Sequence, residues 1–437
     1  MEMTSTIETA GKPAARSNVR IAVVAWLLVS IYYFYQYSLR SAPAVMVPQL
    51  SEAFGVSAFG VASIVGLFYY GYSPFSLVAG AGMDRLGPRK LIPFAAIAVG
   101  IGALLFATGN PAVASVGRFI QGAGGVFALV GAIYIASKNF PANQAATLIG
   151  ATQMFGMAGG SAGQFVVGPL IAGGLAWYTF WNGMGVIALV IGVILFILLP
   201  SQEKKSTEGD SGMKPVIAGF KRVFSNPQSI YCGLIAGLLF VPTTIFDMVW
   251  GVRFLQDSFG FGYAESVLRS ATVPFGWIIG CPLMGFISDK IGRRKPVIMG
   301  GALVLGLCLL WILFGIPGVF PPYVLGVIAG IASGAAMIPY TVIKEANRPE
   351  HSGTATGVIN FINFSLTALF GPLFAARLMR ISEGAAEREL ADYQATFMPM
   401  LIGVALAIGL TLLLRETGPK ARRTSESSLR GAELPAE

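Results

Sequence analysis

The chain has few charged residues and almost no histidine or cysteine. Only 12% of its 437 residues are Asp, Glu, Lys or Arg, about half the share typical of a soluble domain. So few charges cannot cover a water-soluble globule of this size, which excludes an ordinary cytosolic enzyme and also a disordered chain. The single histidine, His351, cannot form a histidine metal site or a proton relay alone. The three cysteines, Cys232, Cys281 and Cys308, lie in apolar runs without C-x-x-C spacing, as buried small hydrophobes do.

Motifs of the common enzyme classes are missing as well. The sequence has no P-loop, no dinucleotide-binding fingerprint and no Ser-His-Asp arrangement, and its glycine-rich stretches lie inside apolar segments rather than after a strand. We therefore expect no enzyme activity, no cofactor and no metal. The 30 Lys and Arg against 21 Asp and Glu give a net charge of +9. A nucleic-acid binder would gather this charge on one solvated face, whereas here it is divided among short connections, so nucleic acid is not an expected partner.

Long apolar segments are what the chain does contain, since 54% of its residues are hydrophobic. Crossing the hydrocarbon core takes about 20 mainly apolar residues, and twelve such segments follow one another. Their expected limits are 21–41, 58–80, 91–108, 112–137, 144–170 and 176–199, then 229–251, 264–287, 296–315, 322–343, 353–379 and 393–414. The predicted fold class is an all-α membrane protein with twelve transmembrane helices, the first of which is expected to be retained rather than cleaved as a signal peptide.

A polar stretch divides the spans into six and six. The expected organisation is a tail at 1–20, a six-helix bundle at 21–199, a linker at 200–228, a second bundle at 229–414 and a tail at 415–437. Most lysines and arginines of the connections then fall on the side of both termini, which the positive-inside rule makes cytoplasmic. We expect a monomeric, multi-pass protein of the plasma (inner) membrane whose basic loops contact anionic lipid.

The two halves repeat each other at an offset of 205 residues. The segment Gly80-x-x-x-Asp84-Arg85-x-Gly87-x-Arg89-Lys90 recurs as Gly285-x-x-x-Asp289-Lys290-x-Gly292-x-Arg294-Lys295, and Leu50-x-Glu52-x-Phe54-Gly55 recurs as Leu255-x-Asp257-x-Phe259-Gly260. Two matches at one offset predict a duplicated six-span unit. Both copies enter the membrane in the same orientation because six is even. Parallel repeats of this kind are one design for alternating access, with the substrate held between the halves.

These features resemble the major facilitator superfamily along nearly the whole chain. The resemblance implies that family's fold, two parallel six-helix pseudo-repeats. It also implies a conformational role for the loop after the second span and for its copy after the eighth, which in the family latch the outward-facing state through charge pairs. The residues concerned are Gly80, Asp84, Arg85, Gly87, Arg89, Asp289, Lys290, Gly292 and Arg294. A loop that only sets membrane topology is the alternative interpretation.

The fourth span contains a further match to the family. Arg118-Phe-Ile-Gln121-Gly122-Ala-Gly124-Gly125 resembles its R-x-x-x-G-x-G pattern. An arginine inside a span needs a carbonyl or carboxylate partner, so we expect Arg118 to act in the scaffold or in gating. Direct contact with substrate and snorkelling to the outer headgroups are the alternatives.

Arg40 is the most informative residue of the first span. Tyr33, Gln36, Tyr37 and Arg40 recur at helical i, i+3, i+4, i+7 spacing and share one face. A guanidinium among polar side chains forms a fork for a carboxylate or phosphate. A tyrosine, then an arginine, then a proline at the end of the first span resembles the organic anion branch of the superfamily, where that arginine grips the substrate carboxylate. Snorkelling of Arg40 to the headgroups is the alternative.

Asp247 is the only carboxylate deep in a span of the second half. Three roles are open: it accepts a transported proton, it pairs with Arg40 across the cavity, or it lies at the outer rim beside Arg253. We take the first as the coupling hypothesis. Uncharged side chains that could help line the substrate site are Tyr69, Tyr70, Tyr72, Gln153, Gln164, Asn360 and Asn363.

The sequence therefore predicts a secondary active transporter that works by alternating access. The expected cargo is a small organic anion or zwitterion, such as a carboxylate, an amino acid or a short peptide, with a proton as co-substrate. Organophosphate exchange, drug efflux by antiport, and a non-transporting sensor on the same fold are the alternatives. Fold alone does not choose among them.

Overall fold

The structure is a computed structural model that describes residues 16–200, 214–316, 318–319, 321, 323–382 and 388–420. Within these residues, twelve helical segments are long and apolar enough to cross a membrane. This is the number that the apolar runs predict. Most of the two expected tails, and residues 201–213 of the linker, lie outside the described residues.

The first half contains six long helices joined by short turns. They are α1 (Arg16–Ser41), α3 (Ala58–Leu86), α4 (Pro88–Phe106), α5 (Pro111–Asn139), α6 (Ala145–Phe165) and α8 (Trp177–Leu198), with short α2 (Val47–Phe54), α7 (Val167–Ala172), η1 (Ala42–Val45) and η2 (Ala142–Gln144). Local chemistry sets several of the boundaries. Asn110 caps α5 by accepting from the amides of Ala112 and Val113, and Pro111 stands at the first helical position, where its missing N–H costs nothing.

The second half repeats this order. It contains α10 (Pro227–Val241), η3 (Pro242–Gly251), α11 (Val252–Phe259), α12 (Tyr263–Ile291), α13 (Lys295–Phe314), α14 (Val324–Ser333), η4 (Gly334–Met337), α15 (Ile338–Glu345), η5 (Pro349–His351), α16 (Ser352–Ile381) and α17 (Leu390–Leu413). One further helix, α9 (Lys214–Phe224), lies in the stretch expected to be the polar linker. The sequence reading did not anticipate it.

The internal repeat is visible in the backbone. Gly55 ends α2 at φ 63°, and Gly260 ends α11 at φ 67°. Gly87 follows α3 at φ 75°, and Gly292 follows α12 at φ 70°. Glycine adopts positive φ at little cost. Gly55 and Gly260 share the left-handed conformation, whereas Gly87 and Gly292 share only the positive φ, because their ψ angles are 169° and 21°.

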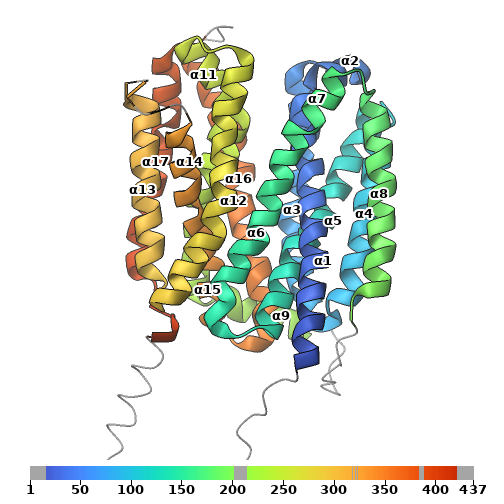
Figure 1. Cartoon of the computed structure of the whole chain (residues 1–437), viewed down its shortest axis with the longest axis vertical. Coiled ribbons are helices and arrows are strands. Elements are labelled where there is room, and N and C mark those ends of the chain that lie inside the picture. Colours follow the sequence, from blue (N-terminus) through green and yellow to red (C-terminus); the bar gives the residue numbers. More distant parts are fainter. Residues whose placement is uncertain are drawn as a thin grey trace, which may run out of the picture.

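The two halves stand side by side, with α6 and α12 adjacent at the middle (Figure 1). The start of α1, helix α9 and helix α15 lie at the lower end, and α2, α7 and α11 lie at the upper end (Figure 1). The buried hydrophobic core runs through both halves and includes Trp181 in the first and Trp277 in the second, both 0% exposed.

The seventh span departs from a regular α-helix. Its middle section, η3, is a π-helix that begins at Pro242 and includes Asp247. Proline has no N–H to donate to the helical ladder, and π-helical turns are often found at functional sites. A continuous apolar run predicts the span but not this irregularity.

Candidate functional site

Arg40 lies near the end of α1 inside a box of aromatic rings. It is 7% exposed. Its Nη2 donates to the Tyr69 hydroxyl at 2.9 Å. The guanidinium carbon is 4.6 Å from the Tyr37 ring centroid, 4.8 Å from that of Tyr69 and 5.0 Å from that of Phe364. Phe364 belongs to α16, so both halves contribute to the box. Arg40 therefore does not snorkel to the headgroups.

The positive charge of Arg40 has no acidic partner among the described residues, and its buried Nη1 has no hydrogen-bond partner there. Neighbouring polar atoms also have no hydrogen-bond partner in the described part of the chain: the Tyr37 and Tyr72 hydroxyls and the side-chain amide atoms of Gln36. Buried polar groups are normally hydrogen-bonded, and an uncompensated buried charge is costly. This cluster therefore has the unmet bonding capacity expected of a site for a polar anion.

A second polar group continues from this cluster into the other half. Asn363 Nδ2 donates to the Tyr340 hydroxyl at 3.0 Å, and that hydroxyl donates to Asn360 Oδ1 at 2.9 Å. Asn360 Nδ2 donates to Ser76 Oγ of α3 at 2.8 Å. Asn363 Oδ1 is buried without a partner. The two asparagines are thus brought together as their spacing predicts.

The uncharged candidates Gln153 and Tyr70 differ in whether they reach the Arg40 cluster. Gln153 of α6 is buried, and its Oε1 accepts from the Tyr33 hydroxyl at 3.0 Å. The Tyr33 ring lies 5.5 Å from that of Tyr37, which connects this pair to the Arg40 cluster. Tyr70 differs: it is 57% exposed, and within the described part of the chain it makes no hydrogen bond with the cluster.

Arg118 is fully buried in α5 at 0% exposure. Its Nη1 donates to Gln121 Oε1 at 2.7 Å and to the Leu39 carbonyl of α1 at 3.3 Å. It therefore does not snorkel, and it ties α5 to the end of the helix that carries Arg40. This geometry supports the scaffold role rather than contact with substrate.

Asp247 is separate from the Arg40 cluster. Its Oδ1 accepts from Ser270 of α12 at 3.1 Å, and its Oδ2 is buried without a partner. Among the described residues it forms no salt bridge with Arg40, so the pairing role lacks its contact in this conformation. Arg253, the residue considered at the outer rim, pairs with Asp257 at 3.0 Å.

Asp84, at the end of α3, reaches the other half. It accepts from the backbone amides of Gly353 and Thr354 at 2.8 and 2.7 Å, and from the Thr354 hydroxyl at 2.8 Å. These amides belong to the first turn of α16, which has no partners within its own helix. A carboxylate at a helix N-terminus also interacts favourably with the helix dipole. Asp84 is therefore a helix cap supplied by the opposite half.

Asp289, the repeat partner of Asp84, does the same for α6. Its Oδ2 accepts from the Thr147 amide and hydroxyl at 2.9 and 2.8 Å. Its Oδ1 pairs with Arg294 at 2.6 Å, and Arg294 pairs with Glu345 at 2.8 Å. Burial lowers the pKa of Arg294, but hydrogen bonds and charges from Glu345 and Asp289 outweigh burial, and the pKa is raised above its ordinary value.

The remaining signature residues surround these caps. Gly80 packs backbone to backbone on α16: a Cβ at Gly80 would lie 2.5 Å from the Gly353 carbonyl oxygen. Its repeat partner Gly285 has the same close approach to Ala146, at 2.4 Å. Arg85 and Lys290 are exposed at the ends of α3 and α12, and Arg89 is half-buried at the start of α4.

The described hydrogen bonds between the halves are confined to one part of the interface. They run from Lys138 and Pro349 at the lower end through the two aspartate caps to Ser73, whose Oγ lies 2.8 Å from that of Ser365. Above this level, the described residues of the two halves form no hydrogen bond with each other. In this conformation the two halves are therefore joined below the Arg40 cluster, and we call this lower end of the molecule the closed end.

Comparisons with known proteins identify the family. The family model described as Major Facilitator Superfamily matches residues 29–372. The chain therefore belongs to this superfamily of membrane transporters and is a multi-pass integral membrane protein. The predicted fold class and the absence of an enzyme fold are confirmed. The E. coli fucose:proton symporter, at 14% identity, superposes with a TM-score of 0.68 and covers 90% of this chain and 98% of that one.

Two curated relatives extend the comparison. The hexuronate transporter of Bacillus subtilis (strain 168) is 25% identical over 285 residues, which are 62% of this chain and 66% of the relative. The membrane sensor protein UhpC of Salmonella typhimurium (strain LT2) is 22% identical over 392 residues, 80% of this chain and 83% of the relative. The match to the hexuronate transporter thus spans just under two thirds of that protein.

Three residues of the site were not predicted from the sequence. Phe364 completes the aromatic box, and Tyr340 and Ser76 join the two asparagines. Tyrosine and phenylalanine are common in membrane spans, so the residue type alone does not indicate that they belong to the site. Only the packing of α3 and α16 against α1 distinguishes them.

Proposed function

We propose that the chain is a secondary active transporter for a small organic anion, which binds Arg40 through a carboxylate. The observation that carries the proposal is the buried Arg40 guanidinium, with one unpaired nitrogen and no acidic partner among the described residues. A carboxylate is the natural partner for such a group. The hexuronate substrate named for the Bacillus relative is a carboxylate of this class.

Arg118 bears on the organophosphate alternative. A phosphate dianion would call for a second free arginine, and the Arg118 Nη1 is already bonded to Gln121 and the Leu39 carbonyl. The Arg118 Nε has no hydrogen-bond partner among the described residues either, but the two Nη1 bonds hold that side chain in place, so a monoanionic carboxylate on Arg40 is the better fit. The sensor named among the relatives supports the non-transporting alternative, which an uptake measurement decides.

The proposed topology places both termini in the cytoplasm. The described basic residues of the signature loops lie at the lower end of the molecule, at the ends of α3 and α12 and the starts of α4 and α13. The positive-inside rule makes that end cytoplasmic. The closed end then faces the cytoplasm, so this conformation is the outward-facing one.

The carboxylate proposal is tested by ligand-induced stabilisation of the purified protein. We expect glucuronate to raise the apparent melting temperature and glucose, which lacks the carboxylate, to leave it unchanged, because a specific ligand stabilises by mass action. Arg40→Gln should abolish the glucuronate shift. Arg40→Lys should weaken binding at least about tenfold, because an ammonium cannot make the bidentate contact.

Arg253→Gln is the matched control, since its side chain is 49% exposed and pairs with Asp257. It should retain the glucuronate shift. Full affinity in Arg40→Lys would overturn the bidentate contact. If a phosphate ester stabilises the protein and glucuronate does not, the organophosphate alternative is favoured.

Proton coupling through Asp247 is the second part of the proposal. The buried Oδ2 without a partner supports it. In proteoliposomes, we expect an inward proton gradient to drive accumulation by the wild type. Asp247→Asn should lose accumulation but keep exchange of labelled for unlabelled substrate, because exchange needs no net proton movement. Wild-type uptake that ignores the gradient would rule out proton coupling.

A further inference from the structure

A cavity lies inside the second half, away from the Arg40 cluster. Its volume is about 160 Å³, and its walls come from η3, α11, α12, α13 and α14. An engineered protein cavity of about 150 Å³ holds benzene. The space is therefore sufficient for a group the size of one ring.

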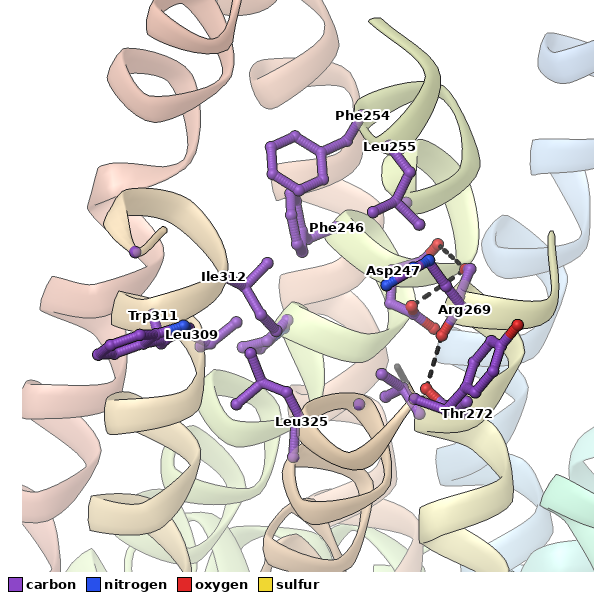
Figure 2. A pocket seen from close by; sticks show the side chains of 18 of the residues that line it. Phe246, Asp247, Phe254, Leu255, Arg269, Thr272, Leu309, Trp311, Ile312 and Leu325 are labelled. Carbon is purple, nitrogen blue, oxygen red and sulfur yellow. Dashed lines mark hydrogen bonds between the residues drawn. The ribbon is translucent and has the colours of Figure 1, made fainter. Parts of the chain in front are cut away.

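Most of the wall is apolar. Figure 2 shows Phe246, Phe254 and Leu255 above the space, Leu309, Ile312 and Leu325 on one side, and Asp247, Arg269 and Thr272 on the other. Small-molecule sites combine such walls with a few polar groups that fix orientation.

The two charged side chains of the wall are not equivalent. The Arg269 guanidinium donates to Glu265 Oε1 from two nitrogens, at 2.9 and 2.7 Å, and stacks 4.2 Å from the Phe261 ring centroid. Its charge is compensated. Asp247 is 9% exposed and has only the neutral Ser270 hydroxyl as a side-chain donor, with Oδ2 unpartnered. The wall thus carries one uncompensated carboxylate.

We propose that this cavity binds a small amine with an apolar body, the ammonium on Asp247 and the body between Phe246, Leu309 and Ile312. An ammonium supplies both the positive charge and the hydrogen-bond donor that Asp247 Oδ2 lacks. The ring-sized apolar space accounts for the rest of the ligand. An anion would meet the carboxylate unfavourably, so this site differs in ligand class from the Arg40 cluster.

The proposal shares Asp247 with the proposed proton coupling but uses none of the cluster around Arg40. Binding is measured without a gradient, so the failure of one proposal is distinguishable from the failure of the other. The experiment is calorimetric titration of the full-length protein in non-ionic detergent with benzylamine, benzyl alcohol and benzoate. Benzylamine should bind, benzyl alcohol at least about tenfold more weakly, and benzoate not at all. Arg40→Gln should bind benzylamine as the wild type does.

Asp247→Asn should weaken benzylamine binding at least about thirtyfold and leave the weak binding of benzyl alcohol unchanged. Glu52→Gln, which removes an exposed carboxylate of the first half, is the matched control and should bind normally. If Asp247→Asn fails to fold, the affinities of the three ligands for the wild type still test whether the cavity prefers an amine. Equal affinity for benzylamine and benzyl alcohol, or unchanged benzylamine binding in Asp247→Asn, would overturn the proposal.

Discussion

Arg40 and Arg118 are both buried in the first half, but their guanidinium groups have different partners. Arg118 donates to a backbone carbonyl and to Gln121. Arg40 donates only to the Tyr69 hydroxyl and otherwise faces rings. Cation–π contacts contribute up to about 2 kcal/mol when desolvated, which is less than the cost of removing a guanidinium from water. Among the described residues each guanidinium keeps one buried nitrogen without a partner, Arg118 Nε and Arg40 Nη1, but Arg118 makes two hydrogen bonds within the protein and Arg40 makes one.

This contrast predicts that replacement by glutamine changes the stability of the unliganded protein more at Arg118 than at Arg40. Arg118→Gln should lower the stability of the unliganded protein by about 1–3 kcal/mol, because it leaves buried acceptors unpaired. Arg40→Gln should change it by less than about 1 kcal/mol, because an uncompensated charge is removed. Thermal unfolding followed by tryptophan fluorescence, without substrate, compares the two. A larger loss for Arg40→Gln would mean that Arg40 is structural.

At the scale of helices, the contact of α3 with α16 depends on glycine. Gly80 and Gly357 let the two backbones meet, and a Cβ at Gly80 would lie 2.9 Å from the Gly357 Cα. Small residues allow this approach in membrane helices. Since the obstructing atoms are backbone, they cannot move aside as a flexible side chain would.

Gly80→Ala should therefore separate α3 from α16 and shift the protein away from the present conformation. Spin labels at Arg85 and Glu350, both exposed at the closed end, should report a longer and broader distance. Gly66→Ala is the control in the same helix, because its Cβ would meet nothing within 4 Å. An unchanged distance in Gly80→Ala would show that the closed end does not depend on this contact.

Elements were predictable to different degrees for physical reasons. The spans follow from apolar length alone, so all twelve were found. The π-helix at Pro242–Gly251 was not, because hydropathy does not record which amide bonds to which carbonyl. Helix α9 was missed because it is amphipathic rather than uniformly apolar.

At the scale of the whole molecule, the duplication was the most informative sequence feature. It predicted two equivalent halves, and Asp84 and Asp289 perform the same task in each. The candidate site was predicted less completely. Arg40 was found because charge is rare in a span. Phe364 and Tyr340 were not, because their roles arise only from packing between helices distant in sequence.

The paired aspartate caps make the conformational change depend on water. When the closed end opens, Asp84, Asp289 and the amides of Thr354 and Thr147 lose the partners they now have in the opposite half. Water must take those positions, because polar groups stripped of partners are costly. The equilibrium between the two states then depends on water activity. Solutes that are excluded from protein surfaces should hold the molecule in the conformation described here, so the osmolarity of the solution at the closed end should shift the equilibrium between the two states.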